Sequence, residues 1–153
     1  MANLEELVGK LKENFPQAIE ETAVSRDEHT IRVKRSHLLE VARFLKDDPE
    51  CGFDFLSDLC GVDYMGRVPR FEVVYHLYSL RHRHRLRMKT SPPDEDLTVP
   101  SVVSVWKTAD WHERECYDLL GITFSDHPDL RRILTPDGFK EYPLRKDFPL
   151  RGR

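Results

Sequence analysis

Residues 71–80, FEVVYHLYSL, constrain the fold more than any other stretch of the sequence. Side chains of a β-strand alternate between its two faces, and here both faces are largely apolar. A strand that is apolar on both faces is covered on both, as strands in the middle of a sheet often are. We therefore expect residues 71–80 to form a central strand. FDFLSDLCGVDY (53–64), with a bulge near Gly61, and RLRMKT (85–90) predict further strands.

The segments before these strands predict two helices and a hairpin. Residues 3–15 carry apolar side chains at helical spacing and stop at a proline. Residues 18–24 and 29–35 alternate weakly and predict a hairpin. Ser36 is placed to act as the N-cap of a second amphipathic helix, which ends near Asp47.

The C-terminal third is less regular. The run SVVSVW (101–106) fits a helix and a strand equally well, and residues 111–120 form a third helix. Beyond that helix the periodic pattern dissolves, and a short helix near 129–134 is the most that the proline-containing tail can hold. The predicted fold is α+β, a mostly antiparallel sheet with helices packed on one face, followed by an irregular C-terminal tail. We expect residues 1–121 to form the domain and residues 122–153 to form an extended partner-docking tail.

The composition excludes several classes of protein. A chain of 153 residues fits one domain, and its net charge of −3 gives no global basic field for nucleic acid or anionic lipid. Three cysteines without a C-x-x-C pair suggest neither a disulfide framework nor a zinc ribbon, and an iron–sulfur cluster usually needs four thiolates. The start, MANLEELVGKLKENF, lacks the apolar run of a signal peptide, and no window approaches about 18 consecutive apolar residues. We therefore expect any attachment to a membrane to be peripheral.

The segment RHRHRLRMK (81–89) concentrates positive charge. In an extended chain, one face carries its basic residues, which are Arg81, Arg83, Arg85, Arg87 and Lys89. One interpretation is an anion- or nucleic-acid-binding stripe, but no glycine-rich loop and no interleaved aromatic residues accompany it. We favour the alternative, a solvated or partner-facing strand edge. His82 and His84 could bind a metal on the other face, but no carboxylate or third histidine supports them, so we predict no metal site.

The stretch DWHERECYDLL (110–120) predicts a charged helix. Asp110 and Glu113 fit a capping box, and Gly121 fits a Schellman stop. At about 100° per residue, one face of the helix is apolar and the opposite face is charged. The apolar face holds Cys116, Tyr117, Leu119 and Leu120, and the charged face holds Arg114, Glu115 and Asp118. Because Arg114 and Asp118 are four residues apart, they can pair.

Two residues break this division. Glu113 points toward the apolar side, where the helix dipole or an arginine from the tail (Arg131, Arg132 or Arg145) could neutralise it. Trp111 projects from the charged side. A tryptophan among charges, with arginines nearby, has the composition of a protein–protein anchor.

Paired carboxylates beside a histidine could also perform acid–base chemistry. The candidates are Glu113 and Glu115 together with His112 or His127. No nucleophile motif, metal triad, phosphate loop or dinucleotide fingerprint accompanies them. We therefore favour docking to a partner over catalysis.

The same stretch resembles a known family. Glu113-Arg114-Glu115, Asp118-Leu119-Leu120, His127 and Arg131-Arg132-Ile133-Leu134 match, in order and spacing, the motif of the 30-kDa subunit of respiratory complex I, which in bacteria is the NADH-quinone oxidoreductase. The ending PLRKDFPL (143–150), which contains Arg145, Lys146 and Asp147, also resembles that family. The resemblance is strong over roughly residues 50–150 and weak before them.

The resemblance implies a role without a cofactor or active site in this chain. Members of the family are similar in carrying no flavin, cluster or quinone of their own, whereas the whole complex transfers electrons from NADH through FMN and Fe-S clusters to quinone and pumps protons. This chain would then be a non-catalytic subunit that docks against the 49-kDa subunit in the peripheral arm, beside the Fe-S and quinone-site subunits. That position implies a peripheral protein on the cytoplasmic face of the bacterial inner membrane.

The expected subunit interface combines Trp111 with the residues of the family motif. Those residues are Glu113, Arg114, Glu115, Asp118, His127, Arg131, Arg132, Arg145, Lys146 and Asp147. Related complexes, such as plastid-type NAD(P)H dehydrogenases, F420 dehydrogenases and membrane-bound hydrogenases, use equivalent subunits. The electron donor therefore follows only from the commonest members of the family. A free-standing anion- or nucleic-acid-binding domain is the alternative from another class.

Overall fold

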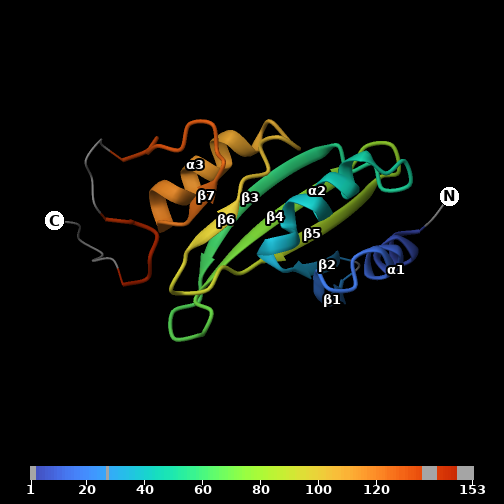
Figure 1. Ribbon diagram of the computed structural model, residues 1–153, viewed down its shortest axis with the longest axis horizontal. Coiled ribbons are helices and arrows are strands. Elements are labelled where there is room, and N and C mark those ends of the chain that lie inside the picture. Colours follow the sequence, from blue (N-terminus) through green and yellow to red (C-terminus); the bar gives the residue numbers. More distant parts are fainter. Residues whose placement is uncertain (1–2, 27, 136–140, 148–153) are drawn as a thin grey trace.

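The main sheet of the protein has five strands, in the order β1-β2-β5-β4-β3 (Figure 1). The computed structural model describes residues 3–26, 28–135 and 141–147. The strands are β1 (Ile19–Ser25), β2 (Glu28–Val33), β3 (Phe55–Asp63), β4 (Phe71–Ser79) and β5 (His84–Thr90). Neighbours run antiparallel, except β2 and β5, which are parallel. The mostly antiparallel sheet is confirmed, and β4 lies between β3 and β5 as its apolar faces predicted.

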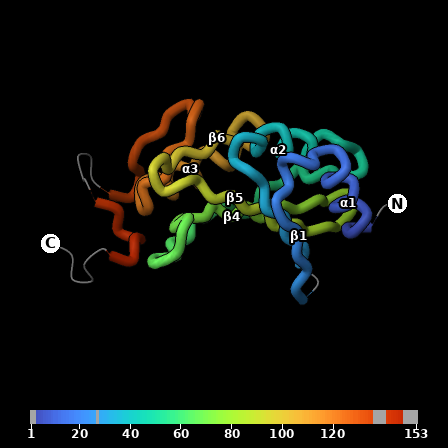
Figure 2. Tube along the Cα trace, turned by 60° about the horizontal axis from the view of Figure 1, so that its bottom comes forward, coloured from blue at the N-terminus to red at the C-terminus, as the bar shows by residue number. Residues whose placement is uncertain are grey.

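Among the described residues, three α-helices pack on one face of this sheet, as predicted (Figures 1 and 2). They are α1 (Leu4–Asn14), α2 (Leu38–Asp47) and α3 (Ala109–Leu120). Alternate residues of β4 face these helices and are buried, because the apolar side chains of both layers meet there. These β4 residues are Phe71, Val73, Tyr75 and Leu77, and α2 contributes Leu38, Val41, Ala42 and Leu45. α3 packs separately, against β3.

Gly61 lets α3 approach β3 closely. A Cβ atom at this position would lie 2.3 Å from Leu120 Cδ1, a side chain in the core. Any larger residue at position 61 would therefore push the helix away from the strand. The bulge predicted near Gly61 is wrong. The register of β3 shifts between Leu56 and Asp58 instead, and Gly61 pairs regularly with Val73.

The start of α2 differs from the prediction. A 3-10 helix, η1 (Arg35–His37), precedes it, and His37 rather than Ser36 occupies the N-cap position. The backbone N–H of His37 donates to the Lys34 carbonyl at 3.0 Å. Ser36 therefore lies inside this tight turn and cannot cap the α-helix.

The beginning of the predicted tail takes part in the fold. β6 (Thr98–Pro100) and β7 (Thr123–Ser125) form a separate parallel pair, in which Phe124 is buried. Residues 101–106, whose pattern fitted helix and strand equally, are mainly a turn, closed by the N–H of Trp106 donating to the Val102 carbonyl at 2.9 Å. Residues 129–134, where the tail could hold a short helix, are irregular.

The face of the sheet that carries no helices, here called the open face, displays the basic strand. Those basic residues divide between β5, which carries Arg85, Arg87 and Lys89, and the turn before it, which carries Arg81 and Arg83. Arg87 pairs with Glu28, and Lys89 Nζ lies 3.5 Å from a carboxylate oxygen of Glu72. Carboxylates thus neutralise part of the stripe, which favours a solvated strand over a nucleic-acid-binding one. The predicted strand edge is wrong, because β5 pairs with β2 on one side and with β4 on the other.

Candidate functional site

The site predicted from the sequence is built on α3. The helix begins at Ala109, with Thr108 at the N-cap position, so Asp110 lies inside its first turn. The predicted capping box is therefore wrong. Gly121 ends the helix in the left-handed conformation at φ +81°, as its place in the sequence predicted, and its N–H donates to the Tyr117 carbonyl at 2.8 Å.

Glu113 points into the core, as the helical pattern predicted, and its side chain is fully buried. Its carboxylate accepts hydrogen bonds from Ser101 Oγ at 2.6 Å and from the Val102 N–H at 2.8 Å. Burial raises the pKa of Glu113 to about 7, although these two hydrogen bonds act in the opposite direction. Glu113 therefore fastens α3 to the turn at 101–106 and does not cap its own helix.

His127 lies beside Glu113, and its side chain is also fully buried. Its Nε2 atom is 4.0 Å from Glu113 Oε1 and 3.1 Å from Asp110 Oδ1. The Nδ1 atom accepts the Asp129 N–H at 2.9 Å, so in the neutral ring Nε2 carries the proton. A substrate could reach Glu113 and His127 only if residues around them moved. Glu115, two positions along the helix, projects in another direction. The four acid–base candidates therefore divide between a buried pair, Glu113 and His127, and a second pair, Glu115 and His112, which lines a hollow between α3 and β3.

Asp118 corrects the helical-wheel prediction. The wheel placed it on the exposed side with Arg114, but its side chain is fully buried because the C-terminal segment (here, residues 122–135 and 141–147) folds back over it. Arg132 Nη1 donates to Oδ1 at 2.9 Å. Three backbone N–H groups converge on Oδ2, those of Ile133 at 3.1 Å, Leu134 at 2.6 Å and Thr135 at 3.0 Å.

The electrostatics of Asp118 follow from these donors. Burial acts to raise the pKa of its carboxyl group, but the hydrogen bonds from Thr135, Leu134 and Ile133 outweigh it and lower the pKa to about 2. The carboxylate therefore stays ionised and holds residues 132–135 against the helix.

None of the three tail arginines neutralises Glu113, contrary to that expectation. Arg132 bonds to Asp118, and the exposed Arg131 pairs with Asp129 at 3.2 Å. Arg145 donates from Nε to the Leu120 carbonyl at 2.8 Å, and its guanidinium lies 4.6 Å from the centre of the Tyr142 ring. These arginines hold the C-terminal segment in place.

The last described residues join the segment to the sheet. The N–H of Lys146 donates to Asp63 Oδ2 at 2.8 Å, and Asp147 lies 3.2 Å from Arg70. Arg70 also bonds to both carboxylate oxygens of Asp63, at 2.7 and 2.8 Å. The hydrogen bond from Arg70, ahead of that from the Lys146 amide, lowers the pKa of Asp63. Lys146 and Asp147 therefore tie the C-terminal segment to the start of β4 and the end of β3.

Trp111 remains at the surface, with 53% of its area exposed. The Arg114 guanidinium lies 5.9 Å from its ring centre, within reach of a cation–π contact. Glu115 lines a small hollow of about 260 Å³ between α3 and β3, together with Leu119 and the exposed Leu144. One side of α3 is thus covered by the C-terminal segment at Asp118 and left open at Trp111.

Several groups that complete the site carry no signal in the sequence. Ser101 and Thr135, which bond to Glu113 and Asp118, show no pattern that distinguishes them from other hydroxyl residues. The neighbouring side chains of Asp58, Cys60 and His76 were also missed, since these lie on two strands whose pairing register is not visible in the sequence.

Comparison with known proteins assigns the chain to a family. The sequence profile of the family described as "Respiratory-chain NADH dehydrogenase, 30 Kd subunit" matches residues 31–153. The chain belongs to this family. An NADH-quinone oxidoreductase subunit of Hyphomonas neptunium is 50% identical over 97% of this chain and 73% of its own length. The corresponding protein of a Methylobacterium species is 53% identical, over 97% of this chain and 69% of its own length.

Two solved structures share the fold. A trypsin-resistant fragment (1–134) of Nqo5 is 31% identical, covers 83% of this chain and 98% of the fragment, and superposes with a TM-score of 0.72. A chain of an archaeal respiratory membrane complex, the membrane-bound sulfane sulfur reductase, is 27% identical, covers 95% of this chain and 85% of that chain, and gives a TM-score of 0.79. As a member of the 30-kDa subunit family, the chain is a complex I-type subunit. Across its described residues, no helix is both long and apolar enough to cross a bilayer.

Proposed function

We propose that this chain is a structural subunit, with no redox cofactor of its own, of the peripheral arm of a proton-translocating NADH:quinone oxidoreductase. The observation that carries this proposal is the identity of about half the residues, over nearly the whole chain, to proteins named as subunits of NADH-quinone oxidoreductase. FMN, the Fe-S clusters and quinone would then be held by other subunits. The assembled complex would place this chain peripherally, on the cytoplasmic face of the bacterial inner membrane.

The site on α3 supports a role in assembly. Several of its charged residues form internal contacts that fix the helix and the C-terminal segment, as the Asp118–Arg132 pair does. Charges used in this way are not free to act on a substrate. We therefore assign the family motif a positioning role. It holds α3 and the C-terminal segment in one fixed arrangement.

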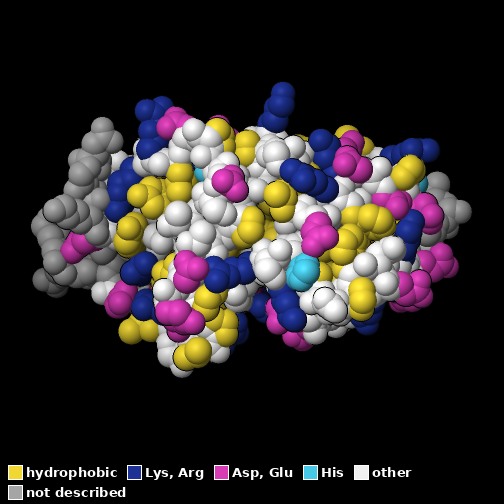
Figure 3. Space-filling model, viewed as in Figure 1, with side chains coloured by type: hydrophobic (Ala, Val, Ile, Leu, Met, Phe, Trp, Pro, Cys, Tyr) yellow, Lys and Arg dark blue, Asp and Glu magenta, His cyan; other side chains and the backbone are white. Residues whose placement is uncertain are grey.

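The partner we propose is the 49-kDa subunit, bound at the N-terminal end of α3, where Trp111 is exposed. Tryptophan and arginine are both enriched at the energetic centres of protein interfaces, and here a half-exposed tryptophan lies next to an arginine. Leu134 and Leu144, both more than half exposed, offer further apolar surface toward the C-terminal end of α3, where the C-terminal segment covers the helix. In Figure 3, hydrophobic side chains border Lys and Arg side chains at the α3 end of the molecule. Such a surface suits a partner with both apolar and acidic groups.

The decisive experiment measures binding of the chain to the 49-kDa subunit of its own complex. We expect Trp111→Ala to weaken binding at least about tenfold, because truncating a central aromatic anchor commonly costs more than about 1.4 kcal/mol. Thermal unfolding should barely change, since the side chain is half exposed. Leu80→Ala, at a 65% exposed residue in the β4–β5 turn, is the matched control and should bind normally. Equal binding by all three proteins would refute the proposed interface.

The cofactor proposal has its own test. The purified chain should be colourless and contain neither flavin nor acid-labile sulfide. A stoichiometric flavin or cluster in this chain alone would refute it. In cells, Arg114→Ala should lower the amount of assembled complex more than it changes the affinity of the complex for NADH.

The same kinds of experiment distinguish two alternative functions. The likeness to a sulfane sulfur reductase chain suits an equivalent subunit in a related complex, which co-purification with an FMN-binding NADH subunit would exclude. A free-standing anion-binding domain would show salt-dependent binding of RNA or DNA through residues 81–89. The pairing of Arg87 and Lys89 with glutamates argues against it.

A further inference from the structure

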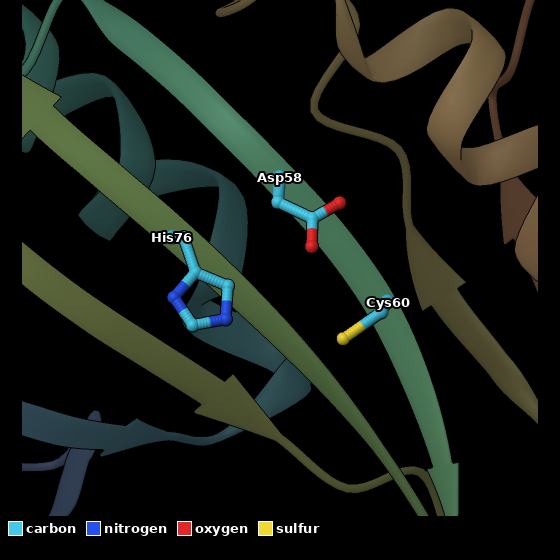
Figure 4. A group of neighbouring side chains, drawn as sticks. All are labelled: Asp58, Cys60 and His76. Atoms are coloured by element: carbon cyan, nitrogen blue, oxygen red, sulfur yellow. The ribbon is translucent and has the colours of Figure 1, made fainter.

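Three potential metal ligands meet on the open face of the sheet, and none of them belongs to the family motif. Asp58 and Cys60 come from β3 and His76 comes from β4 (Figure 4). One ligand atom from each, a carboxylate oxygen, a thiol sulfur and an imidazole nitrogen, lie within 4.8 Å of one another. We propose that these side chains form a binding site for a divalent transition-metal ion with the preferences of Zn²⁺.

The strand pairing builds this site. His76 lies directly opposite Asp58, and Cys60 is the next residue of β3 on the same face, diagonal to His76. Side chains related in these two ways are near neighbours on one face of a sheet. In Figure 4 the sulfur of Cys60 and the ring of His76 point toward one another. The rigid backbone of two paired strands therefore sets the geometry of all three ligands.

The chemistry of the three groups selects the ion. A thiolate, a carboxylate and a neutral imidazole together carry two negative charges, which balance a divalent cation. Zn²⁺ accepts sulfur, nitrogen and oxygen ligands in tetrahedral geometry, and three protein ligands leave the fourth position for water. Mg²⁺ and Ca²⁺ prefer oxygen ligands, so the sulfur of Cys60 argues against them.

The distances require only small side-chain movements. Bonds of about 2.0–2.3 Å in a tetrahedron place the ligand atoms about 3.3–3.8 Å apart. The present limit of 4.8 Å is larger by about an ångström, which rotation of the side chains can close. Burial raises the pKa of the Cys60 thiol, and the negative charge of Asp58 adds to this effect. The thiol is therefore protonated without an ion, and a bound cation would displace its proton.

A fourth residue lies beside the site. His112 of α3 has its Nδ1 atom 3.7 Å from Asp58 Oδ1 and is partly exposed. It is placed to orient the carboxylate, as groups behind metal ligands commonly do. Asp58 and His76 also line a groove of about 510 Å³ on the open face, through which an ion can enter from solvent. A bound ion would cross-link β3 to β4 and, through His112, steady the start of α3.

The test is a zinc titration of the whole chain in competition with a chromogenic chelator. We expect one ion per chain. Removal of a residue behind the ligands typically lowers affinity by about 10–100-fold. His112→Gln should fall in that range, and Cys60→Ser and His76→Gln should lose more. His82→Gln is the matched control, because His82 and His84 form a separate, partly exposed pair of histidines with stacked rings whose centres are 5.9 Å apart. It should leave the affinity unchanged.

Cobalt provides a readout on the unaltered chain itself. Co²⁺ added to the unaltered chain should give a near-ultraviolet absorption from thiolate-to-cobalt charge transfer, and this band should vanish in Cys60→Ser. Absence of the band in the unaltered chain would overturn the proposal. So would persistence of the band in Cys60→Ser, because the thiolate would then be Cys51 or Cys116. If only His82→Gln lost zinc affinity, the ion would bind at His82 and His84 and the proposal would be wrong.

Discussion

Replacing Asp118 by Asn should release the C-terminal segment from α3 while leaving the sheet folded. The fully buried carboxylate has Arg132 on one oxygen and three backbone N–H groups on the other. Asparagine keeps the size of the side chain but removes the charge. It also replaces one acceptor oxygen by an NH₂ group, which can only face those donors unfavourably.

Two contributions set the expected loss of stability. Lowering of the Asp118 pKa from 3.8 to about 2 corresponds to about 2 kcal/mol of stabilisation of the ionised form. Leaving a buried hydrogen-bond donor, such as one of the three amides, without an acceptor costs about 1–3 kcal/mol. The amide variant suffers both losses, so we expect about 3–5 kcal/mol. Because the folded-state pKa is depressed, this stabilisation is present above about pH 4 and is lost as the pH falls toward 2.

Hydrogen exchange measures the effect where it arises. The amides of Ile133, Leu134 and Thr135 all donate to Asp118 Oδ2, so their exchange should accelerate at least about 100-fold in the variant. Amides of β4 should exchange as before. Asp129→Asn is the matched control, since the Asp129–Arg131 pair is exposed and contributes about 1 kcal/mol or less. Unchanged exchange at 133–135, or equal acceleration in both variants, would show that the carboxylate does not hold the segment.

Two further substitutions test the interior of the site. The folded-state pKa of Glu113 is about 7, above its usual 4.5. The free energy of unfolding is therefore lowered as the pH rises from about 4.5 to about 7, because the carboxyl group ionises more readily in the unfolded chain. Between about pH 5.5 and 8 the free energy of unfolding should therefore fall by about 2 kcal/mol more in the natural chain than in Glu113→Gln. Urea titrations at the two pH values measure this difference, and equal falls in the two proteins would contradict the prediction. Gly61→Ala should cost about 1–3 kcal/mol by forcing α3 from β3, whereas Gly9→Ala, where a Cβ meets no atom within 4 Å, should stabilise α1 by about 0.5–1 kcal/mol. Thermal unfolding distinguishes them, and a Gly61→Ala chain as stable as the natural one would refute the close-contact argument.

The sequence predicted those features that depend only on which face of a single helix or strand packs against the core. The alternation in 71–80 located an inner strand, and the helical period placed Glu113 toward the core. Asp118 was misplaced because a helical wheel assumes that one face is buried and the other is wet. Here the C-terminal segment forms a second layer on the far side of α3. Irregular chain gives no periodic signal, so this layer could not be foreseen.

Pairing between strands was equally hidden. Nothing near Asp58 or Cys60 in the sequence indicates His76, because their proximity depends on a register shift between Leu56 and Asp58. The three-residue β7 is too short for alternation to be recognised. Local patterns therefore identified most of the elements, while contacts between distant segments required the structure.

The C-terminal segment also completes the end of α3. The N–H of Leu144 donates to the Leu119 carbonyl at 2.9 Å, and Arg145 donates to the Leu120 carbonyl, so two of the acceptors left unpaired at a helix end are satisfied from a distance of 25 residues. The same helix offers Trp111 at its other end. If a partner that binds there also stabilises the C-terminal segment, the two effects are linked thermodynamically. Whatever factor the partner adds to the stability of the segment, the ordered segment must add to the affinity for the partner.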